Sequence, residues 1–259
     1  MPLATHWPLT ESFRGIKSLH ANGSDNPGPS PTGDQAPNGI EGRLEIVPDP
    51  TGVRGNVMRS TLYETDADTA SHKRSEIAGY AETLSEYWHS WKMMLSPDWT
   101  DYKSPFILMQ IHDTPDVDDG IVKTPNYLVC VIDGHFRVIV PGETLPAETN
   151  VFLRQSGYKI ESGRWYDFCV HTNWATNVTG FREMFIDGIR VVYEFSLPTQ
   201  YTDIIGPYLK LGVYDGLSAS AGWVSRRAYY SDIRIWEGAA THRDGLNRDK
   251  ANPLRITTV

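Results

Sequence analysis

The sequence predicts an all-β fold, a β-jelly roll or sandwich of two antiparallel sheets. Short runs of apolar or alternating character recur along the chain, and they are rich in β-branched and aromatic residues. Turn-forming residues separate these runs, and stretches with the apolar period of a helix are scarce. The chain has 259 residues, of which 40% are hydrophobic, so it is long enough to bury a full core. We therefore expect a single domain over residues 1–259.

In chain order, the pattern predicts a loop, a series of strands and a polar tail. Residues 21–42 are rich in Pro, Gly, Ser and Asn and have no apolar period, so we expect a loop there. Within residues 183–195, Asp187-Gly188 separates two apolar runs and marks a hairpin turn. Residues 238–259 are polar and are expected to form a surface tail or a connector. The expected strands cover residues 43–48, 55–62, 73–82, 87–95, 106–113, 126–133, 135–140, 165–174, 183–195, 208–216 and 229–236.

The charge balance excludes some classes of function. The formal net charge of −8 argues against a nucleic-acid-binding protein and a membrane-surface protein, since both usually present a basic field. No apolar run approaches the roughly 18 residues of a membrane-spanning helix, and the first residues show no export signal. A mature secreted chain, a cytosolic enzyme and a virion component are all compatible with the sequence.

The cysteines and the acidic residues indicate whether the chain has disulfides or metal sites. Cys130 and Cys169 lie in apolar runs, and we expect buried free thiols rather than a disulfide, because two cysteines make no framework. Spacings typical of zinc sites are absent from the sequence. The acidic segment 113–120 offers oxygen ligands for a structural Ca²⁺, although a solvated acidic loop has the same composition.

Three of the expected strands carry polar side chains on one face of otherwise apolar sequence. Residues two apart in a strand point to the same face. Taken alone, each group is typical of a solvated strand end or a same-face salt bridge. Together they predict a curved sheet whose concave face is a wet, partly basic groove. The residues are Arg74 and Glu76 in the first strand, Gln110 and His112 in the second, and Tyr208, Lys210 and Tyr214 in the third.

These residues resemble the signature blocks of the jelly-roll polysaccharide lyases. Arg74-Ser75-Glu76, Gln110-Ile111-His112 and residues 208–214 are similar, in this order, to blocks of the family-seven alginate lyases. The glucuronan lyases of family twenty and the heparin lyase I group share the fold and a related layout. The resemblance covers residues 43–237, and it implies a concanavalin-like β-jelly roll that binds an anionic polysaccharide.

The resemblance implies β-elimination at a uronic acid, in which the C5 proton is removed and the glycosidic oxygen at C4 is expelled. Hydrogen bonds and positive charge must then stabilise the charge that develops at the carboxylate, a role that suits Gln110 and Arg74. Tyr208 is expected to transfer protons, and Lys210 on the same face would favour its phenolate. His112 either completes the carboxylate clamp or serves as the base.

Other residues are expected to contact substrate. His72 precedes the Arg block and shares its polar face if the strand extends that far, where it joins the catalytic set; an exposed turn histidine fits the sequence equally well. The expected substrate-binding residues are Lys73, Glu76, Lys210 and Tyr214.

Two departures from the alginate-lyase pattern bear on the substrate. The third block reads Leu-Lys-Leu-Gly rather than Phe-Lys-Ala-Gly, and Ile77-Ala78 stands where alginate lyases often carry a second Arg. The resemblance therefore implies a glucuronate polymer or a capsular polysaccharide. This substrate class favours a secreted or virion-associated protein, and we expect a monomer that needs no cofactor for its chemistry.

Two rival functions are weighed against this expectation. Jelly-roll glycoside hydrolases use paired carboxylates, often as Glu-x-Asp-x-x-Glu, and the nearest segment, 64–69, lacks the final Glu. A non-catalytic lectin on the same fold would use aromatic platforms but would not need the cationic and proton-transferring set on one face. The tryptophans available for such platforms are Trp88, Trp91, Trp99, Trp165 and Trp223.

Overall fold

The computed structural model describes residues 42–68, 72–100, 106–114, 125–141, 151–201, 205–216 and 222–238. For residues 141 and 151–157, and for three short strands nearer the N-terminus, it describes the backbone alone. All the regular elements in these ranges are strands, β1 to β16, and their pairings are antiparallel. The all-β expectation is confirmed.

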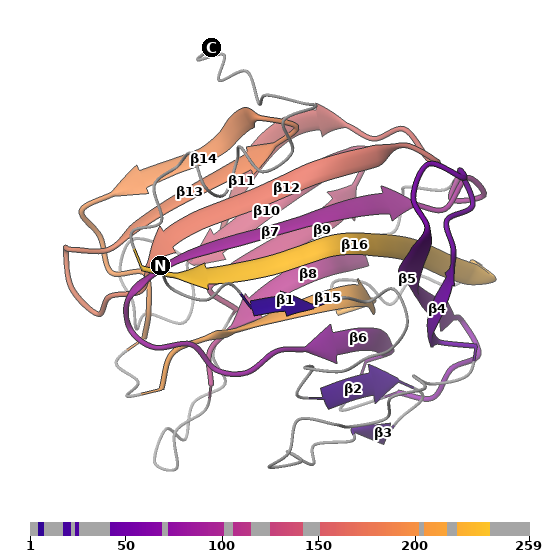
Figure 1. Cartoon of the computed structure of the whole chain (residues 1–259), viewed down its shortest axis with the longest axis horizontal. Helices are drawn as coiled ribbons and strands as arrows, with labels where there is room; N and C mark the ends of the chain where they lie inside the picture. The colour runs from indigo at the N-terminus through magenta and orange to yellow at the C-terminus, as the bar shows by residue number, and fades with distance from the viewer. Residues whose placement is uncertain are drawn as a thin grey trace.

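The strands form two sheets that stack on each other, with β7, β12 and β16 in front of β8, β9 and β10 in Figure 1. We call them the first and the second sheet. The first sheet has the order β14 (Ile189–Phe195), β13 (Phe181–Ile186), β12 (Trp165–Asn173), β7 (Glu86–Leu95), β16 (Ser225–Glu237), β5 (Asn56–Tyr63) and β4 (Leu44–Pro48), and β1 (Thr5–Trp7) pairs with β16. The second sheet has the order β11 (Val151–Lys159), β10 (His135–Pro141), β9 (Tyr127–Ile132), β8 (Phe106–His112), β15 (Tyr208–Tyr214), β6 (Arg74–Ala78), β2 (Ser18–Ala21) and β3 (Ser24–Asp25).

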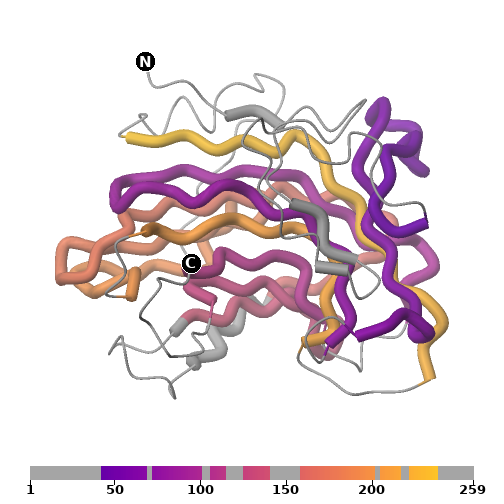
Figure 2. Tube along the Cα trace, turned by 90° about the horizontal axis from the view of Figure 1, so that it is seen from below, coloured from indigo at the N-terminus to yellow at the C-terminus, as the bar shows by residue number. Residues whose placement is uncertain are grey.

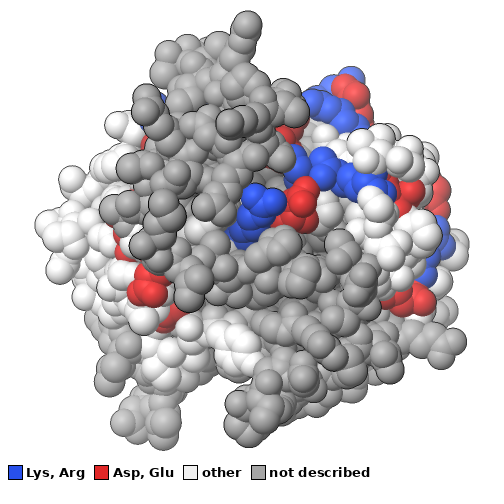
Figure 3. Space-filling model, in the orientation of Figure 1, with Lys and Arg blue, Asp and Glu red and all other residues white. Residues whose placement is uncertain are grey.

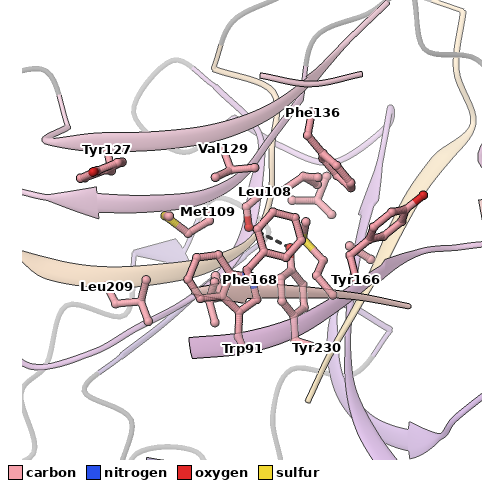
Figure 4. Packing of buried hydrophobic residues seen from close by; sticks show 14 of the residues in the cluster. Trp91, Leu108, Met109, Tyr127, Val129, Phe136, Tyr166, Phe168, Leu209 and Tyr230 are labelled. Carbon is pink, nitrogen blue, oxygen red and sulfur yellow. Dashed lines mark hydrogen bonds between the residues drawn. The ribbon is translucent and has the colours of Figure 1, made fainter. Parts of the chain in front are cut away.

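The core lies between the two sheets and is built from alternate residues of each strand. Trp91 stacks on Phe168 in the first sheet, with ring centroids 5.2 Å apart, and Met109 and Leu209 come from the second sheet (Figure 4). Burying each such side chain contributes about 1.5–3 kcal/mol. Because side chains alternate, the residues between these core positions must point to the outer face of their sheet. This alternation places the polar residues of β6, β8 and β15 on one outer face.

Strands distant in sequence run side by side, as β7 (purple) and β16 (yellow) do in Figure 2. The predicted hairpin is confirmed: β13 and β14 are joined by Asp187 and Gly188, whose φ angles of 49° and 77° suit a tight turn between twisted strands.

The strand predictions were wrong in several places, and β16 also begins at Ser225, before the expected run 229–236. The expected strand 73–82 ends at Ala78, after which residues 79–85 cross to the first sheet. The strand β11 at Val151–Lys159 was missed, and so were the short strands β1 to β3. Of the expected loop 21–42, Ala21 and Ser24–Asp25 are in strands; short polar strands at a sheet edge lack the apolar alternation on which the prediction depended. Residues 22–23, 26–41 and 239–259 lie outside the described residues.

Two β-bulges shape the second sheet next to the polar face. The pairing of β15 with β8 shifts register between Leu211 and Tyr214, and that of β8 with β9 shifts between Ile107 and Met109. Tyr230, which comes from the first sheet, reaches across the core and hydrogen-bonds Leu108 O at 2.8 Å and Gly212 O at 3.0 Å (Figure 4 draws the bond to Leu108). Bulges re-aim the side chains beside them, and here the first sheet satisfies the carbonyl groups that they expose.

Gly212 is required by this local geometry. Its φ of 151° is rarely adopted by other residues, and a Cβ atom added here would lie 2.0 Å from the carbonyl oxygen of Ser75. Ser60, another residue of the first sheet, accepts a hydrogen bond from Val213 N at 3.0 Å and donates one to Ser75 O at 2.6 Å. The strands β6 and β15 are therefore held together and held to the core at this point.

Both cysteines are free and buried, as expected. The described residues contain no helix long and apolar enough to cross a membrane. They also contain no cluster of three His, Cys, Asp or Glu side chains that would hold a metal. Residues 115–120 of the acidic segment lie outside the described ranges, so Ca²⁺ there stays a prediction.

Candidate active site

The three strands with polar faces are neighbours in the second sheet, in the order β8, β15, β6. Lys210 on β15 lies opposite Gln110 on β8, and Tyr208 lies opposite His112. Directly opposed residues in an antiparallel pair have side chains on the same face. The structure thus brings together four residues that the sequence analysis selected from segments about 100 positions apart.

A buried carboxylate links two of them. Glu76 Oε2 lies 2.8 Å from Lys210 Nζ, and Gln110 Nε2 donates to Glu76 Oε1 at 2.6 Å. The three residues are only 1–3% exposed. Burying charge costs several kcal/mol per ion unless the charges pair and hydrogen-bond, as they do here.

The charge state of Glu76 follows from its partners. Burial by itself raises the pKa of this carboxyl group, but the charges of Lys210 and Arg74 and the two side-chain contacts outweigh it and hold the pKa below its ordinary value. Glu76 is therefore a carboxylate that orients Lys210 and Gln110. The ammonium of Lys210 has two further hydrogens and the amide of Gln110 has one more, so both groups can still donate to a ligand.

Tyr208 and His112 form the second part of the site, at the end of the same face. Their rings are tilted by 31° with centroids 5.9 Å apart. His112 Nδ1 lies 2.9 Å from the carbonyl oxygen of Asp113 and 3.0 Å from its Oδ1. A ring that donates from Nδ1 and is neutral has Nε2 as its acceptor, which is the form a general base needs.

Asp113 was missed as a site residue in the sequence analysis. It was included only in the acidic segment 113–120, yet it is 2% exposed and contacts His112. A carboxylate directly after a candidate base is the signal that could have identified it.

Arg74 and Tyr214 lie at the opposite end of the face from Tyr208. They are register partners, and the Arg74 guanidinium carbon is 4.5 Å from the centroid of the Tyr214 ring. Burial raises the pKa of the Tyr214 hydroxyl, and the positive charge of Arg74 partly offsets this. The two tyrosines are the first and last of the 7 residues of β15, which places them roughly 20 Å apart along a regular strand. The face therefore has two aromatic ends. Between them lie Glu76, Lys210 and Gln110, which we call the Glu76 group.

His72 joins the Tyr214 end of the face. Its ring meets the Tyr214 ring edge-on at 5.8 Å, and its Nδ1 is 3.9 Å from Asp215 Oδ1. Asp215, a second carboxylate absent from the sequence predictions, also accepts a hydrogen bond from Lys73 N at 2.7 Å. The Lys73 side chain pairs with Asp68 instead of with the Glu76 group, which raises the pKa of its ammonium. The structure does not bring Lys73 together with the other cations of the face.

The face becomes largely apolar toward β9 and β10. Ile107 of β8 packs there in one buried cluster with Leu128, Cys130 and Ile139. The cation Arg137 on β10 lies on the same face, because it is the register partner of Cys130. The tryptophans that a lectin would offer as platforms do not lie on the face. Four of them, Trp88, Trp91, Trp99 and Trp223, are at most 5% exposed. Buried indoles cannot serve as exposed binding platforms.

Known structures share this fold. The crystal structure of the endo-β-1,4-glucuronan lyase from the fungus Trichoderma reesei matches with a TM-score of 0.64 and 18% identity, covering 87% of this chain and 95% of that one. The alginate lyase from Klebsiella pneumoniae matches with a TM-score of 0.62 and 13% identity, covering 90% and 99%. Alginate lyase PA1167 from Pseudomonas aeruginosa matches with a TM-score of 0.59 and 16% identity, covering 78% and 88%. At these identities the likeness shows the jelly-roll fold.

The family follows from a separate comparison of sequences. No curated protein sequence matches the chain. The family model described as polysaccharide lyase, however, matches residues 15–234, a range that includes every candidate site residue on β6, β8 and β15. The chain therefore belongs to the polysaccharide lyase family, as the resemblance of its three sequence blocks implied.

Proposed function

We propose that this lyase cleaves a uronic-acid polysaccharide by β-elimination on the outer face of β8, β15 and β6. The observation that carries the proposal is the buried Glu76 group beside Tyr208 and His112. Buried charges retained on an outer face are costly, and perturbed pKa values of this kind concentrate at functional sites. The solved structures named above include a glucuronan lyase and two alginate lyases, and both polymers consist of uronic acids.

In this mechanism, Lys210 and Gln110 neutralise the substrate carboxylate. The C5 proton is weakly acidic while that carboxylate is charged, so donors aimed at it lower the barrier by stabilising the developing enolate. Glu76 accepts from both donors, which fixes their geometry before substrate binds. Such preorganised donors cost no rearrangement at the moment of reaction.

Tyr208 and His112 transfer the protons. The Tyr208 hydroxyl protonates the leaving oxygen at C4, and His112 Nε2 or the Tyr208 phenolate removes the proton at C5. The His112 ring is oriented for this step by its contact with Asp113. Both side chains are partly exposed, as groups that must touch substrate have to be.

The Tyr214 end binds a different part of the polymer. Arg74 is a bidentate donor for a carboxylate, and it lies on β6 opposite Tyr214, too far along the sheet to share the sugar that contacts Tyr208. We assign Arg74, His72 and Tyr214 to binding a neighbouring uronate unit, with Lys73 at the periphery. This changes the role expected for Arg74, from neutralising the reacting carboxylate to binding another one.

For the substrate, we propose a glucuronate polymer, such as glucuronan, or a glucuronate-containing capsular polysaccharide. The test is incubation of the purified chain with glucuronan, alginate, heparin, hyaluronan and bacterial capsules while ultraviolet absorbance follows the unsaturated uronate product. We expect absorbance to rise fastest with glucuronan or a capsular polymer. Binding without any rise in absorbance would support the lectin alternative instead.

A further inference from the structure

A second buried carboxylate lies outside the proposed catalytic face. Glu82 belongs to the crossover, residues 79–85, that leads from β6 in the second sheet to β7 in the first. Its side chain is 4% exposed, and both of its oxygens are hydrogen-bonded. A buried carboxylate with two partners requires a specific structural or functional reason.

The partners of Glu82 come from the first sheet. His89 Nε2, on β7, lies 2.6 Å from Glu82 Oε1, and Trp174 Nε1, just after β12, donates to Oε2 at 2.6 Å. His89 is fully buried and Trp174 is 1% exposed. Removing either donor would leave a buried oxygen unpaired, a change that costs more than a typical hydrogen bond contributes. The carboxylate therefore fixes the crossover to the first sheet.

The backbone of Glu82 holds the segment that leads into Tyr208. Glu82 N donates to Pro207 O at 2.8 Å, and Gly206 N donates to Glu82 O at 3.1 Å. The two chains approach so closely that a Cβ atom at Gly206 would lie 2.3 Å from Glu82 O. On the other side of Tyr208, Gly79 N donates to Leu209 O at 2.8 Å. The crossover thus contacts the residues immediately before and after Tyr208.

The same segment is also connected to the His112 side of the site. Thr114, two residues after His112, donates from Oγ1 to Gly206 O at 2.8 Å. Gly206 is therefore bonded to Glu82 on one side and to the strand end that carries His112 on the other. A shift of Glu82 would move Gly206 and Pro207, and with them the position of Tyr208 relative to His112.

We propose that Glu82 is a positioning residue for Tyr208, acting through Gly206 and Pro207 and held in place by His89 and Trp174. This inference rests on the proposed function, since it assigns to Glu82 the alignment of the proton-transferring hydroxyl. Small displacements of a catalytic group lower kcat strongly while substrate binding elsewhere on the face is retained. Glu82 itself contacts none of the residues assigned to the substrate carboxylate.

The test uses Trp174→Phe, which removes one donor to Glu82 and keeps an aromatic ring, and Glu82→Gln, which keeps the shape of the side chain. The matched control is Trp165→Phe, which removes an indole donor to Asp49 in the turn between β4 and β5. We expect kcat to fall roughly 10- to 100-fold in the first two variants, with KM within about twofold of the parent and little change in the control. The assay is product absorbance on the polymer that the parent cleaves.

Hydrogen exchange supplies a readout that does not depend on activity. We expect the amides of Glu82 and Gly206 to exchange at least about 10-fold faster in Trp174→Phe and Glu82→Gln than in the parent or the control, because these amides form the bonds that the carboxylate stabilises. Unchanged exchange at these amides, or equal losses of kcat in the control, would overturn the inference. A parent chain that cleaves no uronate polymer would instead refute the proposed function, and exchange alone would then decide whether Glu82 holds this segment.

Discussion

The outer faces of the two sheets carry charge in different ways. On the first sheet, Lys92 pairs with Asp167 on the neighbouring strand, and the two side chains are 16% and 33% exposed. On the second sheet, Glu76 pairs diagonally with Lys210 on the neighbouring strand, and the two side chains are only 1% and 4% exposed. Figure 3 shows Lys and Arg next to Asp and Glu on the side of the molecule toward the viewer, without a field of one sign among the described residues.

The two kinds of ion pair have different consequences for stability. Pairs that are partly in water contribute about 0–1 kcal/mol and serve any soluble surface. A dry pair is often no more stable than apolar residues of the same volume, so stability does not explain why it is kept. We therefore propose that the dry ion pair on the second sheet marks the functional face.

The largest expected effect concerns the two tyrosines at the ends of the functional face. Tyr208→Phe should lower kcat roughly 10²–10⁴-fold, because it removes the proton-transferring hydroxyl and leaves the ring. Tyr214→Phe, the matched variant, should raise KM by a few-fold and leave kcat nearly unchanged. Initial rates on the cleaved polymer measure both. The opposite result would move the reacting sugar to the Arg74 end.

The second prediction compares the ion pairs of the two faces directly. Glu76→Gln should lower the free energy of unfolding by about 3–5 kcal/mol, because it leaves Lys210 charged and buried without its partner. Asp167→Asn, which breaks the partly exposed pair on the first sheet, should cost about 0–1 kcal/mol. Urea denaturation measures both values. Equal costs in the two variants would remove the distinction between the faces.

The stability of the folded chain should depend on pH through the carboxyl group of Glu76. The pKa of Glu76 is lowered in the folded chain, so its contribution to stability is present above the ordinary glutamate pKa of about 4.3 and is lost as the pH falls through the lower folded value. The parent should therefore lose more stability than Glu76→Gln on acidification below about pH 4.3.

Asp215 provides a control of opposite sign. Burial raises the pKa of its carboxyl group, so Asp215 opposes folding as the pH rises through its ordinary range. Replacing it in Asp215→Asn should make stability rise more with pH than in the parent. Denaturant midpoints across the acidic range would test both signs, and parallel curves for the parent and Glu76→Gln would contradict the first.

The smallest effect concerns the two cysteines, which lie in buried clusters on the outer faces of the two sheets. Burial raises the pKa of both thiols to about 12, so little reactive thiolate exists near neutral pH. Neither Cys130 nor Cys169 should react with a thiol reagent until the chain unfolds, when both should react. A thiol reagent that releases a chromophore when it reacts allows the thiols to be counted by absorbance. One rapidly reacting thiol in the folded chain would show that the sheet face carrying that cysteine opens.

The sequence identified most of the fold because its signal is local. The two-residue period of apolar side chains located the core strands, and Asp187-Gly188 located a hairpin that the structure confirms. The same period put Gln110 with His112 and Lys210 with Tyr208, since side-chain alternation does not depend on which strands pair. The strand β11 and the short strands β1 to β3 lack that strong local pattern, and they were missed.

Only the tertiary structure decided which polar groups meet. An Arg-x-Glu pair suggests a bridge within one strand, yet Glu76 contacts Lys210 and Gln110 from neighbouring strands. The register of β15 placed Arg74 at Tyr214, far from Tyr208, and the crossover placed Glu82 against His89. Alternation is encoded in each strand, but strand order, register and bulges come from packing across the whole sandwich, which no single segment specifies.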